Sequence, residues 1–133
     1  MKVLFDAIMT KYNASTALKA ANTGGLHREV APQNARLPYT VMHQISGKPR
    51  DTFTEFIENY IIQFNIYDST ASDDSVDDIF TKLTAAFDYC TLTISGYTHV
   101  IMRRVLNQSF FNEDEASRVW QYVVQYEIEM QKT

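Results

Sequence analysis

The sequence predicts an α+β fold in which two helices pack on one face of a mainly antiparallel sheet of five to six strands. Two stretches, 58–68 and 120–131, alternate apolar and polar side chains, as strands with one dry and one mostly wet face do. Between them, apolar residues recur every three or four positions, which indicates one stripe of an amphipathic helix. The members of this stripe are Val76, Ile79, Phe80, Leu83 and Phe87. A strand followed by a helix that folds back over it forms the centre of the predicted fold.

Size and composition restrict the class of protein. At 133 residues the chain fits one domain, which we place at 1–133. Its net charge of −4 and pI of about 5.3 argue against a surface that grips phosphate groups. The single cysteine, Cys90, excludes an internal disulfide framework and suits a reducing compartment. Asp6 interrupts the first apolar run, so we expect no signal peptide. No apolar run approaches the length that spans a bilayer, and we expect a cytosolic protein in the cell that makes it.

The N-terminal region predicts a helix, a short edge strand and a loop. One apolar stripe marks the helix: Leu4, Phe5, Ile8, Met9 and Tyr12. The pattern weakens over 13–16, where we expect a break, and Gly24 with Gly25 closes the helical region. Residues 26–30 are expected to form the edge strand, and 31–38, with two prolines, the loop.

The middle of the chain predicts a hairpin and then the second helix. Residues 39–46 and about 54–67 are interpreted as antiparallel strands joined by a long basic tip. The helix is expected to begin near Ser72 or Ser75, since Ser75 and Asp78 have the spacing of a capping box. Four acids lie where the helix dipole favours negative charge: Asp73, Asp74, Asp77 and Asp78.

The C-terminal part predicts three more strands. Thr91–Ile94, followed by Ser95 and Gly96 and then by 97–108, is interpreted as a second hairpin. Residues 112–117 form an acidic turn before the last strand. That strand directs Trp120, Tyr122, Val124, Tyr126, Ile128 and Met130 to one face. We expect the helix stripe to cover the dry side of the sheet at Phe64, Ile66, Tyr122 and Val124.

The opposite face of the predicted sheet is polar. Six residues on it must meet water or a polar partner surface: Gln63, Asn65, Gln121, Gln125, Glu127 and Glu129. Glu127 and Glu129 lie on this same face and could in principle act as a general acid and a general base. Two carboxylates on a solvent-facing strand, however, more often only keep that face hydrated. We therefore hold a hydrolase as a third, minor alternative.

The sequence contains no catalytic or metal-binding constellation. His27, His43 and His99 are scattered and share no ligand spacing, and Cys90 is the only thiol. The acids before the second helix lack the glycine turn and the final Glu of a calcium loop. Gly24 and Gly25 are an isolated pair and do not form a phosphate-binding loop. We therefore expect no enzyme activity, no metal and no cofactor, and take a binding or assembly role as the default.

Basic residues concentrate at two places. Lys48 and Arg50 lie in the hairpin tip, and Arg103 and Arg104 lie in a later strand. A solvated tip and a docking element on a rigid hairpin explain the first pair equally well.

The order of parts resembles the tail-completion family of long-tailed bacteriophages, also called tail terminator or head-tail joining proteins. The resemblance rests on Leu4–Ile8, Ala31–Gln33, Leu37–Val41, Gln44–Gly47 and Ile62–Tyr67, the last leading through a short polar loop into the second helix. It covers nearly the whole chain, and its motifs are short. The family has no catalytic residues to transfer.

The resemblance implies a subunit of a ring, of six copies, at the head-proximal end of the tail tube. The ring stops tail growth and joins the tail to the DNA-filled head, and DNA passes through its channel without specific binding. Its partners are other copies, the tail tube protein, and a head-completion or connector protein. The implied location is the tail-head junction of the virion, with the host cytoplasm before assembly.

We expect the ring contact to join two charged patches. The first is the hairpin tip with Lys48, Arg50 and Asp51. The second is the acidic turn with Glu113, Asp114 and Glu115, or else the acidic start of the second helix. The six-residue polar face is a further possible channel lining or interface.

A small α+β ligand-binding or regulatory domain is the alternative of another class. It would use Trp120, Tyr122 and Tyr126 around a pocket, although these aromatic residues are also explained as core beneath the helices.

Overall fold

A computed structural model describes residues 2–69, 74–113 and 118–133 of the chain. The elements follow in the order α1 (Lys2–Ala14), α2 (Thr16–Ala21), β1 (Leu26–Arg28), β2 (Tyr39–Pro49), β3 (Ile57–Asp68), α3 (Asp74–Phe87), β4 (Tyr97–Glu113) and β5 (Arg118–Lys132). Among the described helices, none has the length and apolar character needed to cross a lipid bilayer.

The strands form one five-stranded sheet in the order β1-β2-β3-β5-β4. The short β1 runs parallel to β2, and all other neighbours are antiparallel. The predicted hairpin of β2 and β3 is confirmed, with Met42 opposite Phe64. The other edge of β3 pairs with β5, where Phe64 lies opposite Val124. β5 therefore lies between β3 and β4. The mainly antiparallel α+β sheet is therefore as predicted.

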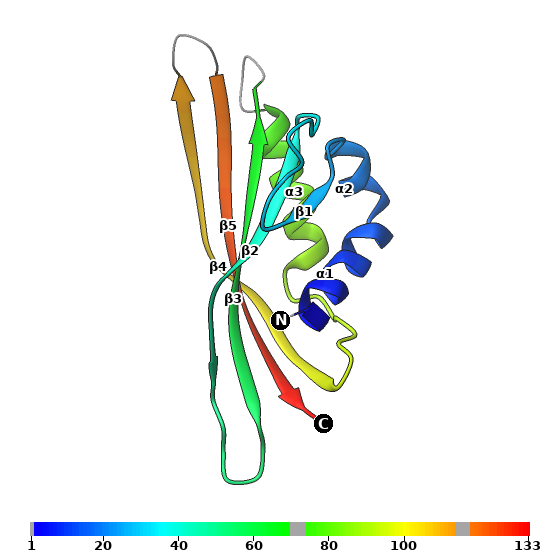
Figure 1. Cartoon of the computed structure of the whole chain (residues 1–133), viewed down its shortest axis with the longest axis vertical. Coiled ribbons are helices and arrows are strands. Elements are labelled where there is room, and N and C mark those ends of the chain that lie inside the picture. The colour runs from blue at the N-terminus through cyan, green and yellow to red at the C-terminus, as the bar shows by residue number, and fades with distance from the viewer. Residues whose placement is uncertain (1, 70–73, 114–117) are drawn as a thin grey trace.

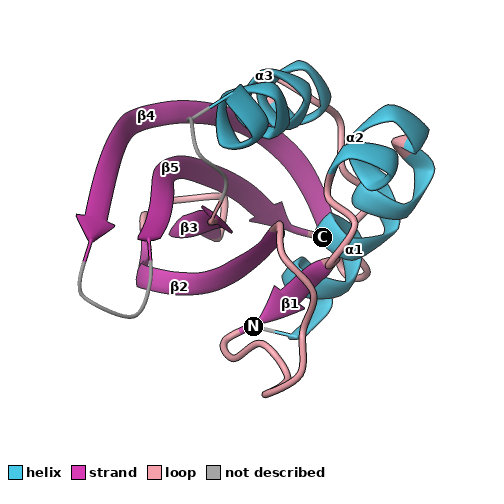
Figure 2. Ribbon diagram, turned by 90° about the horizontal axis from the view of Figure 1, so that it is seen from above, coloured by secondary structure: helices cyan, strands magenta, loops and turns pink. Residues whose placement is uncertain are grey.

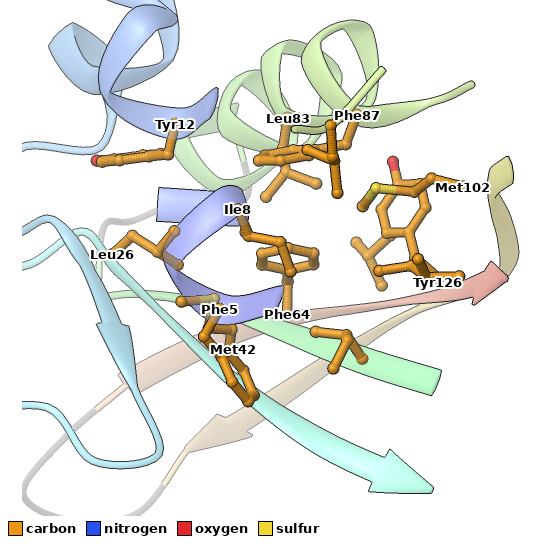
Figure 3. Close-up of a cluster of buried hydrophobic side chains, with 14 of the residues drawn as sticks. Phe5, Ile8, Tyr12, Leu26, Met42, Phe64, Leu83, Phe87, Met102 and Tyr126 are labelled. Atoms are coloured by element: carbon orange, nitrogen blue, oxygen red, sulfur yellow. The ribbon is translucent and has the colours of Figure 1, made fainter. Parts of the chain in front are cut away.

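The helices pack on one face of this sheet and close the core. On α3, Phe87 is fully buried, with its ring centroid 5.3 Å from that of Phe64. Phe80 is half-buried and packs edge-on against Tyr122 at 5.6 Å. Figure 3 shows side chains of α1 and α3 meeting over those of the strands, which include Phe64 and Tyr126. The predicted contact between the helix stripe and the dry sheet face is confirmed.

The structure has three helices where two were predicted. The expected break at 13–16 separates α1 from α2, because Ser15 bonds to the preceding turn. Its amide donates to Tyr12 O and its hydroxyl to Lys11 O, each at 3.0 Å. Beyond α2, the amide of Gly24 donates to Pro38 O at 2.7 Å. A Cβ at this glycine would lie 1.7 Å from Arg36 O, so no larger residue fits here.

Two sequence predictions are wrong. α3 begins at Asp74, close to the predicted start, but Ser75 is its second residue and therefore does not cap it, while Ser72 lies outside the described residues. Thr91–Ile94 forms no strand, so the predicted hairpin with 97–108 does not exist. Leu92 and Ile94 are instead buried loop residues that anchor the connection from α3 to β4. These two buried residues are two positions apart, which imitates the alternation of a strand. A period of two over so short a stretch does not distinguish a strand from such a loop.

The sheet is curled and elongated. Figure 2 shows the strands curving around the central β3, with the helices gathered at one side. In Figure 1 the hairpin of β2 and β3 projects at one end of the long axis, and that of β4 and β5 reaches the other. The two hairpin ends are therefore far apart within one molecule.

Candidate assembly surfaces

The second face of the sheet carries a ladder of amide side chains. Gln125 Nε2 donates to Gln63 Oε1 at 2.8 Å, across β5 and β3. Gln63 Nε2 in turn donates to Asn65 Oδ1 at 2.9 Å, and Gln121 Nε2 donates to the same oxygen at 3.2 Å. Period two placed these four residues on one face, and the structure shows that they also bond to one another.

This face is less exposed than predicted. Asn65 is only 4% exposed, and Val123 beside it on the same face is 7% exposed. The three glutamines of the ladder are half-buried, because their amides bond to neighbours on the sheet and do not extend into water. The four ladder residues thus form an uncharged patch on the curled sheet (Figure 2), in which side-chain amides bond to one another.

Two ion pairs stand beside the ladder and occupy both glutamates of the face. Arg103 Nη2 of β4 donates to Glu127, and Arg50 Nη1 from the β2–β3 connection donates to Glu129. Asn59 Nδ2 adds a bond to Glu129 Oε1 at 3.3 Å. The hydrogen bond from Arg103 lowers the pKa of Glu127 below its usual range. A carboxylate held ionised in this way is a poor proton donor, which removes the physical basis for an acid/base pair.

The β2–β3 tip is less basic than its sequence indicates. Because Arg50 is paired with Glu129, only Lys48 of the two predicted tip cations has no ion pair within the described part of the chain. Asp51 Oδ1 accepts a bond from the amide of Ile57 at 3.3 Å, which shapes the turn. Lys48 and Asp51 are both exposed and stand at the projecting end.

The same tip carries two phenylalanines that sequence reasoning missed. Phe53 is fully exposed and Phe56 is 65% exposed. The sequence did offer a signal for their exposure: Phe53 lies within the polar run Asp51–Glu55, and Phe56 directly follows it. No alternating pattern there predicts that either side chain is buried. Exposed aromatic side chains on a rigid turn are typical anchors of protein contacts.

The predicted acidic patch lies at the opposite end of the molecule. Glu113 is the last residue of β4, whereas Asp114 and Glu115 lie outside the described residues. In Figure 1 this end is the farthest from the tip that carries Lys48. The structure therefore does not bring the two predicted patches together within one chain, and only separate copies could join them.

His27 and His43 have local structural partners. His27 Nε2 lies 2.8 Å from Gly24 O, and His43 Nδ1 lies 3.4 Å from Asn65 Nδ2. Burial raises the pKa of the Cys90 thiol, which disfavours the reactive thiolate. No cluster of three or more metal-ligating side chains is present in the described ranges.

Of the three aromatic residues of the alternative pocket, Tyr126 is a core residue, and Trp120 and Tyr122 are partly buried against the core. Tyr126 is fully buried and donates its hydroxyl to Asp88 Oδ1 at 2.6 Å. Tyr122 packs on Phe80, and the Trp120 ring lies 4.3 Å from that of Phe111. These contacts favour the explanation of the three rings as packing beneath and beside the helices.

Comparison with known proteins adds a family and a fold. A family model described as tail completion protein gp17 matches residues 6–131. A search of curated proteins finds no match to the chain. A solved chain from the virion of a native gene transfer agent particle has a TM-score of 0.70 at 14% identity, over 93% of this chain and 92% of that chain. Another solved chain has a TM-score of 0.53 at 14% identity, with coverages of 96% and 94%.

Proposed function

Because the chain belongs to the tail completion protein gp17 family, we propose that it closes the head-proximal end of a phage tail tube as a ring of six subunits. The ring ends tail growth and joins the tail to the DNA-filled head. The observation that carries this proposal is the family match over 6–131, which leaves only a few residues at each end unmatched. The protein is accordingly a structural protein of a phage virion.

The placement of the two hairpin ends supports ring closure. A ring needs a heterologous contact, in which one patch of a subunit meets a different patch of its neighbour. Lys48 and Asp51 lie at one end of the long axis, and Glu113 lies at the other. We propose that the tip, including Arg50, meets the acidic end of the next copy, where Asp114 and Glu115 continue the run of acids.

The amide ladder supports a role for the second face as a channel lining or as an interface. Gln63, Asn65, Gln121 and Gln125 carry no charge, and Glu127 and Glu129 are each neutralised by an arginine. These six residues present no unpaired cation, so their part of the face does not hold phosphate groups by counterion release; Lys48, which has no ion pair among the described residues, lies farther along the same face, opposite Asn59. DNA can therefore pass such a face without specific binding.

The partners and location follow from the same proposal. The ring would contact the tail tube protein on one side and a head-completion or connector protein on the other, at the tail-head junction. Before assembly the subunit would reside in the host cytoplasm, without membrane contact. The two paired carboxylates and a half-buried thiol whose pKa is raised support a purely structural role without catalysis or cofactor.

A complementation experiment tests the tip contact. Lys48→Glu reverses the exposed charge of the tip and leaves the Arg50–Glu129 pair in place. We expect unchanged circular dichroism and melting, together with fewer tails joined to heads and lower infectivity, because reversed charge at an interface weakens association. Lys19→Glu on α2 is the matched control, since Lys19 is equally exposed but away from both ends. Normal head joining by Lys48→Glu would contradict the assignment of the tip as a contact.

A further inference from the structure

A pocket, here called the loop pocket, lies at one end of the polar sheet face, between the loop that follows β1 and the strands β2 and β3. Its volume is about 450 Å³, within the roughly 300–1,000 Å³ of sites that hold small molecules. Its lining includes Glu29 and Gln33 from the loop, Tyr39 and His43 from β2, and Asn65 and Tyr67 from β3.

The backbone holds the loop against the sheet. Glu29 N donates to Met42 O at 2.8 Å, and Val30 N donates to Arg28 O at 2.7 Å. Glu29 has a φ of +67°, in the left-handed region that residues with a side chain rarely adopt. These contacts fix the place from which the Glu29 side chain leaves the loop.

His43 adds no positive charge to the loop pocket. Asn65 Oδ1 accepts hydrogen bonds from the amides of Gln63 and Gln121. The Nδ2 of Asn65 is left to face His43 Nδ1, at 3.4 Å. An amide nitrogen only donates, so His43 Nδ1 accepts and carries no proton. The imidazole is therefore neutral in this arrangement.

Glu29 is the only charged residue among the described residues that line the loop pocket. Its carboxylate is exposed and has no ion pair in the ranges that the structure describes. The neighbouring Arg28 lies elsewhere, with its guanidinium over the ring of Phe5, 4.2 Å from the centroid. The loop pocket therefore carries an uncompensated negative charge.

Two tyrosine rings form an aromatic wall of the loop pocket. Tyr39 and Tyr67 are partners across β2 and β3, with ring centroids 5.4 Å apart and ring planes inclined by 42°. Burial, together with Tyr39, raises the pKa of Tyr67, so its ring stays an uncharged phenol at neutral pH. The face of such a ring attracts a cation.

We propose that the loop pocket binds one organic cation, an alkylammonium or alkylguanidinium group, between the Glu29 carboxylate and the rings of Tyr39 and Tyr67. The carboxylate matches the charge of this group, and the rings match both its charge and its apolar stem. An anion would meet the negative charge of Glu29 and no compensating cation. The site does not depend on ring formation, so this proposal and the proposed function can each fail without the other.

A titration followed by amide NMR tests the class of ligand. The probe is n-butylammonium, which has the structure of a lysine side chain, added to the whole chain at constant ionic strength. We expect saturable shifts at the amides of Glu29, Tyr39 and Tyr67. The matched control is 1-butanol, in which a hydroxyl replaces the ammonium group, and it should produce no saturable shift. Equal shifts with both compounds, or no saturable shift with n-butylammonium, would overturn the proposal.

A second probe identifies the source of the cation, which can be a free amine or the basic side chain of a protein neighbour. Nα-acetyl-lysine N-methylamide carries the same ammonium group together with the flanking peptide groups. Binding of both probes would assign the loop pocket to a side chain presented by a polypeptide. Binding of n-butylammonium alone would assign it to a free amine.

Two matched pairs of variants test the walls. Glu29→Gln should weaken the binding of n-butylammonium about fivefold, whereas Glu55→Gln at the β2–β3 tip changes the net charge equally and should leave it unchanged. Tyr67→Leu should weaken binding roughly fivefold, while Tyr67→Phe, which keeps the ring, should retain most of it. Equal affinities within either pair would contradict the role given to that residue.

A third pair does not rely on a residue of the sheet and serves if Tyr67→Leu does not fold. Gln33 is exposed on the loop and lines the same pocket. Gln33→Lys adds a competing positive charge and should weaken the binding of n-butylammonium, whereas Gln33→Glu should strengthen it. The same affinity for both variants would show that the cation does not bind in the loop pocket.

Discussion

Phe64 and Asn65 are neighbours in β3, yet they are held in place by different forces. Phe64 points to the helices, is fully buried, and contacts the rings of Phe87 and Tyr126. Asn65 points to the other face and is almost as buried, but it is fixed by hydrogen bonds to Gln63 and Gln121. The same strand thus has one face stabilised by apolar packing and one stabilised by an amide ladder.

The difference shows which face can change during evolution and assembly. Apolar burial contributes in proportion to area, so any truncation on the helix face opens a cavity. A net hydrogen bond contributes only about 0.5–1.5 kcal/mol, so single changes on the ladder face leave the fold intact. The second face can therefore be adapted to a partner surface while the helix face keeps the domain folded.

The largest expected effect is on the helix face. Phe64→Ala should lower the free energy of unfolding by about 3–5 kcal/mol, because a buried Phe leaves a cavity among the rings of Phe87 and Tyr126. Urea unfolding measures the loss. Phe53→Ala at the exposed tip is the control and should change stability by less than about 0.5 kcal/mol. Similar losses for both variants would mean that the helix-covered face is not the core.

The next effect is at the centre of the ladder. Asn65→Ala should cost about 1–3 kcal/mol, since the side-chain amides of Gln63 and Gln121 both lose their acceptor in a half-buried place. Asn65→Asp keeps an acceptor at the same position and should recover part of the loss. If Asn65→Ala lowered the free energy of unfolding as much as Phe64→Ala does, the two faces of β3 would not differ in how strongly they stabilise the fold.

The end of the ladder should be weaker still. Gln125→Ala removes one bond to Gln63, at 2.8 Å, and should cost about 1 kcal/mol. A double-mutant cycle with Gln63→Ala isolates the pair, and a coupling energy near zero would show that the bond contributes nothing in solution.

The smallest effect is a dependence on pH. Arg103 lowers the pKa of Glu127, so this pair stabilises the fold above the ordinary carboxyl pKa of roughly 4.3 and loses that contribution as the pH falls through the lowered folded value. Thermal melting between neutral and acidic pH should show wild type losing slightly more stability than Glu127→Gln. Identical pH profiles would mean that the ion pair does not form in solution.

Much of the fold was predictable from local patterns. The alternation over 58–68 and 120–131 identified both central strands, and the stripe ending at Phe87 identified the face of α3. Thr91–Ile94 misled the prediction because Leu92 and Ile94 are loop anchors whose spacing imitates a strand. Local pattern also did not show that 97–113 pairs with the last strand, since that pairing is determined by the whole sheet.

The candidate surfaces were only partly predictable. Period two placed the ladder residues on one face, but it does not show that their amides bond to one another. Arg50 was predicted as a free contact residue, yet it pairs with Glu129, 79 positions along the chain. Such a pairing depends on the register of three strands and has no local signal. The charges of Lys48 and Glu113 were visible in the sequence, whereas their separation along the long axis required the structure.

Trp120 is a natural fluorescence probe of the contact between β4 and β5. It is the only tryptophan of the chain, and its ring lies against Phe111 of β4 with centroids 4.3 Å apart. Its Nε1 is buried and has no hydrogen-bond partner among the described residues. An indole in such dry surroundings emits at shorter wavelengths than one in water. Tryptophan emission, excited at wavelengths that the eight tyrosines do not absorb, therefore reports on a single place in the unlabelled protein. A red shift that precedes the loss of secondary structure would reveal β4 separating from β5 while the rest of the domain stays folded.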